Sequence, residues 1–246
     1  MSTSLFHILN ISRMDMMSRM TALDTVSNNV SNINTMGYRG SRSNFQEMLD
    51  KAKLEGVHLT STQLNTAQGA VVQTGNQLDI AIQGDGFFMV NLGDGKTGYT
   101  RDGQFMIDGQ GRLVTADGNP LIWTGTIPTD AEEIAFQPDG TVQTRSGDTW
   151  QDAGTINLAR FANPSALQLN GNNVLVETVA SGTAQTGAPG TQLFGTLLGQ
   201  AVERSNVNIA DEMTNMIVIQ RNFQMSTRIF QATDTMINEA IHVRKS

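Results

Sequence analysis

Few residues in this 246-residue chain have the types and spacing that catalysis or metal binding requires. Cysteine is absent, and the three histidines, His7, His58 and His242, lie far apart in the sequence. Thiolate and histidine-rich metal sites are therefore not expected. The sequence also contains no G-x-S-x-G, H-E-x-x-H or phosphate-loop motif. We predict a protein with no catalytic residue, no cofactor and no metal.

Acidic residues are the remaining candidates for chemistry. Six Asp-Gly dipeptides begin at Asp85, Asp94, Asp102, Asp108, Asp117 and Asp139. An EF-hand calcium loop needs ligands at several fixed positions and a terminal glutamate, which the stretch "DGQGRLVTADG" does not supply. Asp-Gly between apolar runs is instead typical of β-hairpin turns. The adjacent Glu132 and Glu133 point in different directions, so they do not favour a glycosidase pair.

Composition excludes several classes of protein. The net charge of −7 argues against a nonspecific nucleic-acid binder, which needs a basic face. No run of about 18 apolar residues is present, so no membrane insertion is expected. The N-terminal segment has polar residues among its apolar ones and lacks the continuous apolar core of a secretory signal. The protein is expected to stay in the cytoplasm or to leave by a route that removes nothing.

Apolar stripes occupy both ends of the chain. The first consists of residues seven apart: Leu9, Met16, Leu23 and Val30. The second has the same spacing: Ile209, Met216, Phe223, Phe230 and Ile237. This spacing predicts two helices with a coiled-coil-like seam, and further apolar residues lie outside both stripes. Gln220, Thr227 and Asp234 follow the second stripe by four residues, either buried to fix the register or solvated at its edge.

Polar residues mark the ends of these helices. Asn208 is expected to be the N-cap of the last helix, with Asp211 and Glu212 in its first turn, where the helix dipole favours acids. The string "SNNVSNINTMGYRGS", residues 27–41, indicates the end of the first helix. Gly37 is expected to provide the backbone freedom to leave it.

The central region predicts β structure. From residue 78 to residue 180, short apolar runs alternate with turn signals. Residues 37–77 are expected to form a short helix or irregular arm followed by extended chain, and residues 181–190 a loop. The predicted class is α+β, with terminal helices that pair as a coiled-coil-like module and a β-rich domain inserted between them. The predicted domains are 1–36 with 205–246 (helical module), 37–77 with 181–204 (connecting arm and extended segments), and 78–180 (outer β domain).

The polar string resembles the N-terminal signature of the flagellar rod and hook protein family. The matching positions are Asn28, Asn29, Val30, Ser31, Asn32, Thr35, Gly37, Tyr38 and Arg39. Residues 78–90 and 99–121 resemble the family's β-region blocks, and residues 205–224 resemble its C-terminal helix motif. Within the family the chain is most similar to the distal and proximal rod proteins, because it has no room for the further outer domain that the hook protein usually carries.

The resemblance implies a structural subunit of the bacterial basal-body rod, which polymerises into the axial shaft that transmits torque from motor to hook and encloses the export channel. The terminal helices would form the inner layer and the β domain would face outward. The implied partners are further copies in a helical polymer, other rod proteins, the hook, surrounding ring proteins and the flagellar export apparatus, but no nucleic acid. Export across the inner membrane without a cleaved signal peptide is also implied.

The stripes and the resemblance together indicate a set of subunit-interface residues. They are Leu9, Met16, Leu23, Asn28, Asn29, Val30, Asn32, Gly37, Tyr38, Arg39, Asn206, Asn208, Met216, Gln220, Arg221, Phe223, Phe230 and Ile237. Two alternatives stay open: a short hook-type protein, and a rod-associated binding module that does not polymerise.

Overall fold

The chain is α+β, as predicted, with a helix at each end and a β-rich middle. The computed structural model describes residues 2–50, 53–93, 95–191 and 193–243, without the side chains of residues 2–8, 45–50, 53–61 and 240–243. It forms two compact units. The helical unit comprises Met1–Ser31, Ser41–Gln63 and Asn208–Ser246, and the β unit comprises Asn32–Gly40 and Leu64–Val207.

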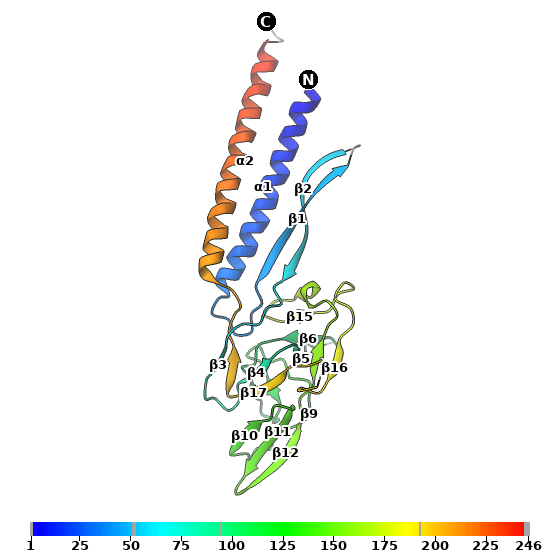
Figure 1. Cartoon of the computed structure of the whole chain (residues 1–246), viewed down its shortest axis with the longest axis vertical. Helices are drawn as coiled ribbons and strands as arrows, with labels where there is room; N and C mark the ends of the chain where they lie inside the picture. Colours follow the sequence, from blue (N-terminus) through cyan, green and yellow to red (C-terminus); the bar gives the residue numbers. More distant parts are fainter. Residues whose placement is uncertain (1, 51–52, 94, 192, 244–246) are drawn as a thin grey trace. The chain divides into compact units, whose positions relative to one another are not determined.

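The helical unit contains α1 (Ser2–Ser31) and α2 (Ile209–Val243), which lie side by side and run antiparallel (Figure 1). The α2 N-cap prediction is confirmed: the Asn208 side chain accepts a hydrogen bond from Ala210 N at 3.0 Å, and the Asn208 carbonyl accepts one from Glu212 N at 3.0 Å. These bonds satisfy backbone donors that the first helical turn leaves open.

The arm after α1 differs from the prediction of a short helix or irregular segment. Instead β1 (Ser41–Asp50) and β2 (Lys53–Leu64) form a two-stranded sheet. The second strand carries the stretch "GVHLTST", whose β-branched residues fit an extended backbone better than a helix. Pairing with this strand overrides the helix-forming residues of the first.

The contact side of α2 follows a spacing of three and four residues. The buried or half-buried positions along it are Met216, Ile219, Phe223, Ser226, Phe230, Thr233 and Ile237. Four of the five residues of the predicted stripe are therefore half-buried, whereas Ile209 is exposed. The buried companions of the stripe lie three residues after it rather than four. Gln220 and Asp234 are exposed, and Thr227 is half-buried. Whether the helices adopt coiled-coil geometry stays a prediction.

The β unit consists of short antiparallel strands in several small sheets. One four-stranded sheet has the order β10 (Glu133–Phe136), β11 (Thr141–Ser146), β12 (Thr149–Thr155) and β9 (Thr124–Gly125). Another has the order β14 (Gln168–Leu169), β15 (Leu175–Val176), β6 (Thr97–Thr100) and β5 (Phe88–Asn91). The two-stranded sheets pair β17 (Thr196–Gly199) with β4 (Ile80–Gln83), β18 (Ala201–Glu203) with β3 (Val71–Gln73), β13 (Leu158–Arg160) with β16 (Gln185–Gly187), and β7 (Met106–Ile107) with β8 (Leu113–Val114).

Strand β5 lies between two hydrophobic clusters. Because side chains alternate along a strand, Phe88 and Val90 enter one cluster, while Phe87 and Met89 enter the other. All four residues are buried. The run "GFFMV" is thus continuous in apolar character because both faces of the strand are covered.

Some expected turns are hairpins and some are not. Asp139-Gly140 connects β10 to β11, and the Asp108 carboxylate accepts hydrogen bonds from Gln110 N and Arg112 N at 2.9 Å in the turn between β7 and β8. Asp102-Gly103, in contrast, lies at a close backbone approach, because a Cβ on Gly103 would meet the Ile80 carbonyl oxygen at 1.6 Å. Asp94 lies outside the described residues.

The segment predicted as a loop, residues 181–190, contains a strand. Residues Gln185–Gly187 form β16 and pair with β13, and Ser181 is fully buried. Strands β17 and β18 then complete the unit, contributing the buried Leu197, Ala201 and Val202. The small polar residues of this segment do not by themselves indicate a strand. The pairing depends on a partner strand about 25 residues earlier in the chain.

These pairings predict that a fragment of residues 32–207 unfolds cooperatively, whereas a fragment limited to the predicted domain, 78–180, does not. The shorter fragment lacks β16 and β17, the partners of β13 and β4, and it also lacks the pair formed by β3 and β18. It loses the buried Tyr38, Leu64, Leu197, Ala201 and Val202. Thermal unfolding followed by near-ultraviolet circular dichroism measures the difference. A cooperative transition of equal size in both fragments would support the predicted boundaries instead.

Candidate functional site

A buried carboxylate lies at the centre of the site in the β unit. Glu203, the last residue of β18, is 1% exposed. Its two oxygens contact two guanidinium groups, Arg39 Nη2 at 2.9 Å and Arg101 Nη1 at 3.2 Å. One carboxylate is thus shared by two buried arginines. We call these three residues the arginine–glutamate cluster.

Residues 37–40 of the polar string, which we call the signature segment, contact this cluster through their backbone. Gly37 N donates a hydrogen bond to the Glu203 carbonyl at 2.7 Å. Gly37 has φ +65°, and a Cβ there would meet the carbonyl carbon of Arg101 at 2.3 Å. The position therefore requires glycine for both its conformation and its space. Tyr38 is buried next to it.

Asn206 fixes the same segment from a second direction. Its Oδ1 accepts a hydrogen bond from Gly40 N at 2.8 Å, and its Nδ2 donates to the carbonyls of Asn65 at 3.0 Å and Ala67 at 2.7 Å. Arg39 donates to the carbonyls of Thr66 and Ala67. These bonds hold the signature segment, residues 65–67 and the residue Asn206 after β18 together.

The electrostatics of the cluster are unbalanced. Burial lowers the pKa of Arg39, although Glu203 opposes the shift. Burial and the charge of Arg39 lower the pKa of Arg101 to about 10. The Arg101 guanidinium also lies 5.2 Å from the centre of the Phe87 ring, a cation–π distance. Two buried positive charges therefore meet one buried negative charge.

In the helical unit, the buried Asn29 likewise joins several elements through hydrogen bonds. It is 2% exposed. Its Nδ2 donates to the Ser41 carbonyl at 2.8 Å and to Glu212 Oε1 at 2.8 Å, and its Oδ1 accepts from Ser41 N at 2.9 Å. One asparagine thus links the end of α1 to the start of β1 and to the first turn of α2. The sequence predicted only a helix-dipole role for Glu212.

Polar contacts also link the middle of the two helices. Ser226 donates a hydrogen bond to Asp15, which forms an ion pair with Arg19 at 3.2 Å. Thr227 donates to Met16 Sδ at 3.7 Å. The inner face of the helix pair is therefore partly polar.

The structure places the predicted interface residues in different environments. Gly37, Tyr38, Arg39 and Asn206 converge in the β unit, and Asn29 links three elements of the helical unit. Leu9, Met16, Leu23, Val30, Met216, Phe223, Phe230 and Ile237 are half-buried along the helices. Asn28, Gln220 and Arg221 are exposed, Asn208 caps α2, and Asn32 accepts a hydrogen bond from Thr35 in the turn after α1.

Sequence reasoning missed Glu203 and Arg101 as partners of Arg39. Both lie far from Arg39 in the chain, and a lone acid at the end of an apolar strand does not name its partner. One signal was available in the stretch "AVE", residues 201–203. Its apolar residues indicate a buried strand, and an ionised glutamate in a buried strand requires a cation as partner.

The described residues contain no cluster of three or more side chains suited to hold a metal ion. Within the same residues, neither helix has the combination of length and apolar character needed to cross a membrane. The side chains of His7, His58 and His242 lie outside the described ones.

Three family models match separate parts of the chain. The flagella basal body rod protein model matches residues 15–39, the flagellar hook protein FlgE/F/G D1 domain model matches residues 81–144, and the flagellar basal body rod FlgEFG protein C-terminal model matches residues 198–242. Each match contains one residue of the arginine–glutamate cluster.

Relatives match over nearly the full length. The flagellar basal-body rod protein FlgG of Bacillus subtilis (strain 168) is 36% identical over 250 residues, covering 92% of this chain and 94% of the relative. The FlgG of Caulobacter vibrioides is 36% identical over 245 residues, with 90% and 93% covered. This chain belongs to the flagellar basal-body rod protein family. A rod protein named FlgF, from Mesorhizobium japonicum, is 32% identical over 223 residues, with 89% and 90% covered. This rod protein is of the FlgG type.

In this rod protein, Glu203→Ala is predicted to reduce the free energy of unfolding by about 3–5 kcal/mol, because it leaves two guanidinium groups buried without a carboxylate. Urea denaturation measures the change. The matched control is the exposed Glu132→Ala, expected to cost less than about 0.5 kcal/mol. Equal, small effects of both variants would show that the cluster does not stabilise the unit.

A pH dependence is predicted at Asp102, which follows the cluster's Arg101. Burial raises the pKa of its carboxyl from 3.8 to about 6. A raised pKa means that the folded state prefers the protonated form, so this group stabilises the fold below pH 3.8 and loses that contribution as the pH rises through 6. Unfolding midpoints measured from pH 4 to 7 should fall less steeply in Asp102→Asn than in the natural protein. Parallel curves would contradict the prediction.

Proposed function

We propose that this rod protein is a structural subunit that polymerises with further copies of itself into the axial shaft of the flagellar basal body. Membership of the rod family supports a structural role rather than catalysis. The observation that carries the assembly proposal is the outer face of α2, where large apolar side chains stay in contact with water.

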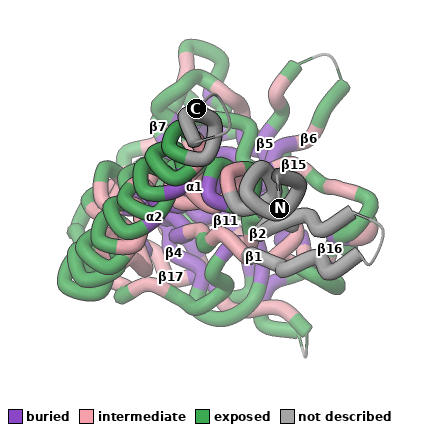
Figure 2. Tube along the Cα trace, turned by 90° about the horizontal axis from the view of Figure 1, so that it is seen from above, coloured by how far each residue is buried: buried purple, intermediate pink, exposed green. Residues whose placement is uncertain are grey.

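Seven large apolar residues of α2 are at least half exposed. They are Ile209, Met213, Ile217, Val218, Met225, Ile229 and Met236. On α1, Met17 and Met20 are exposed by 62% and 56%. Figure 2 shows the long exposed course of α2. Apolar surface of this extent marks an interaction site, and its burial contributes about 25 cal/mol per Å².

We propose a layered arrangement of the two units in such a shaft. The terminal helices, residues 1–36 and 205–246, would form an inner layer around the export channel and pair as a coiled-coil-like module. The β-rich region centred on residues 78–180 would face outward, with residues 37–77 and 181–204 as the connections. Many copies that share helical contacts would give the stiffness required to transmit torque from motor to hook.

The proposed partners are further copies of the chain, other rod proteins, the hook, surrounding ring proteins and the export apparatus. Export across the inner membrane without a cleaved signal peptide is part of the same proposal. The predicted interface residues on both helices would take part in subunit contacts, with the exposed Gln220 and Arg221 among them.

Two alternatives are less well supported. A short hook-type protein fits poorly with the relatives, which are named as rod proteins and match over about nine-tenths of the chain. A binding module that does not polymerise would leave the apolar residues of α2 exposed permanently, at a cost in solubility.

The assembly proposal predicts that the double variant Met225→Asp with Ile229→Asp remains folded but monomeric. Both side chains are exposed and lie one helical turn apart, so the new charges disrupt an interface without disturbing the core. Sedimentation at rising protein concentration gives the association state, and circular dichroism gives the helix content.

The control for this prediction is Gln110→Asp with Ala116→Asp, which adds the same charge at exposed turn positions of the β unit. It should assemble like the natural protein at moderate ionic strength. Normal assembly of the Met225 and Ile229 double variant would exclude this face as a subunit interface.

A further inference from the structure

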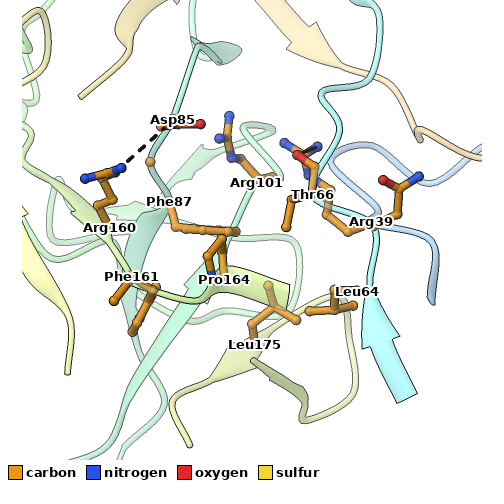
Figure 3. Close-up of a pocket in the computed structure, with 13 residues that line it drawn as sticks. Arg39, Leu64, Thr66, Asp85, Phe87, Arg101, Arg160, Phe161, Pro164 and Leu175 are labelled. Atoms are coloured by element: carbon orange, nitrogen blue, oxygen red, sulfur yellow. Dashed lines mark hydrogen bonds and ion pairs between the residues drawn. The ribbon is translucent and has the colours of Figure 1, made fainter. Parts of the chain in front are cut away.

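The two arginines of the arginine–glutamate cluster line a cavity in the β unit. The cavity has a volume of about 100 Å³ and is lined by the three arginines Arg39, Arg101 and Arg160 and by the apolar side chains of Phe87, Phe161 and Leu175, among others (Figure 3). It therefore combines a cationic part and an apolar part.

The positive charge at this cavity exceeds the negative charge. Behind the lining, Glu203 is shared by two arginines. The carboxylate that lines the cavity, Asp85, is 78% exposed and lies 4.0 Å from Arg160 Nε. Arg101 is only 5% exposed, and no described group accepts a hydrogen bond from its Nε. A buried donor without an acceptor costs free energy, and an entering carboxylate would supply both the acceptor and the missing charge.

The same unit carries a complementary surface. The turn before β10 exposes Asp130 and Glu132, and the turn between β11 and β12 exposes Asp148, followed by Trp150, which is 47% exposed. The two turns are joined by a hydrogen bond from Ser146 Oγ to Asp130 Oδ2 at 2.7 Å. We call these four residues, Asp130, Glu132, Asp148 and Trp150, the acidic tip.

The charge of the acidic tip is not neutralised internally. Arg145, which lies 5.8 Å from the centre of the Trp150 ring, pairs with Glu133 at 2.7 Å instead. Within the described part of the chain, no ion pair reaches the carboxylates of the tip. Within the β unit, the hairpin of β11 and β12 extends at one end, whereas β15, which carries the cavity residue Leu175, lies toward the other (Figure 1).

We propose that the acidic tip of one copy docks against the arginine-lined cavity of the next copy. Carboxylates of the tip would compensate the excess positive charge, and Trp150 would cover the apolar wall. Two different surfaces at opposite ends of one unit give a head-to-tail contact, which continues into an open polymer instead of closing as a dimer. The contact rests on the proposed function, since it requires copies held in a shaft.

Cysteine cross-linking tests this contact, because the natural chain contains no cysteine. Thr66 lines the cavity, Thr149 lies between Asp148 and Trp150 of the acidic tip, and both threonines are exposed. Full-length Thr66→Cys and Thr149→Cys proteins are mixed at a concentration where sedimentation shows assembly, and then oxidised. A disulfide-linked pair of the two variants is expected. The matched control, Thr66→Cys with Ala116→Cys, places the second thiol at another exposed turn and should give no such pair.

A charge exchange sharpens the test. Arg160→Glu in the Thr66→Cys copy should abolish the cross-link, and Asp148→Lys in the Thr149→Cys copy should restore it, with unchanged melting curves for each protein. If the protein assembles normally but the Thr66–Thr149 pair gives no more cross-linked product than the Thr66–Ala116 control, the contact is wrong and the proposed function stands. If the natural protein does not assemble at any concentration in sedimentation, the proposed function is wrong and this contact with it.

Discussion

Two arginines that share one carboxylate determine how the β unit is built. Glu203 ends the last strand, Arg39 belongs to the segment after α1, and Arg101 follows β6, so the ion pairs join three distant parts of the chain. Buried charges impose strict geometry, because removal of one partner leaves the other desolvated. The positive φ of Gly37 and the hydrogen bonds of Asn206 follow from this constraint, since both hold Arg39 within reach of Glu203.

The helical unit distributes its polar and apolar residues in an unusual way. Asp15, Asn29, Ser226 and Thr233 lie among the buried or half-buried positions, whereas methionine and isoleucine side chains face water along α2. Polar contacts fix the register of a helix pair but contribute little net free energy. A helix pair of this kind is weakly stabilised by itself and gains most of its stability from surfaces that cover its apolar face, which is the property an assembling subunit requires.

The sequence predicted the fold class, the two helices, the Asn208 cap and most strands between residues 78 and 160, because each depends on local periodicity or capping. It did not predict β1 or β16 as strands, and for the region of β2 it predicted only extended chain. β1 becomes a strand by pairing with β2, and β16 by pairing with β13. Of the site, the signature residues Gly37, Tyr38 and Arg39 were recognised, but Glu203 and Arg101 were not. Ion pairing between residues more than 60 positions apart leaves no spacing pattern, so only the folded chain reveals it.

We propose that other subunits cover the exposed apolar side chains of α2, while the β unit is stable alone. Hydrogen exchange of the full-length protein, compared between monomer and assembled polymer, tests it most directly. Amides of residues 213–236 should exchange rapidly in the monomer and become strongly protected on assembly, whereas those of β5, β11 and β17 should be equally protected in both states. Full protection of residues 213–236 in the dilute monomer, unchanged on assembly, would contradict the account.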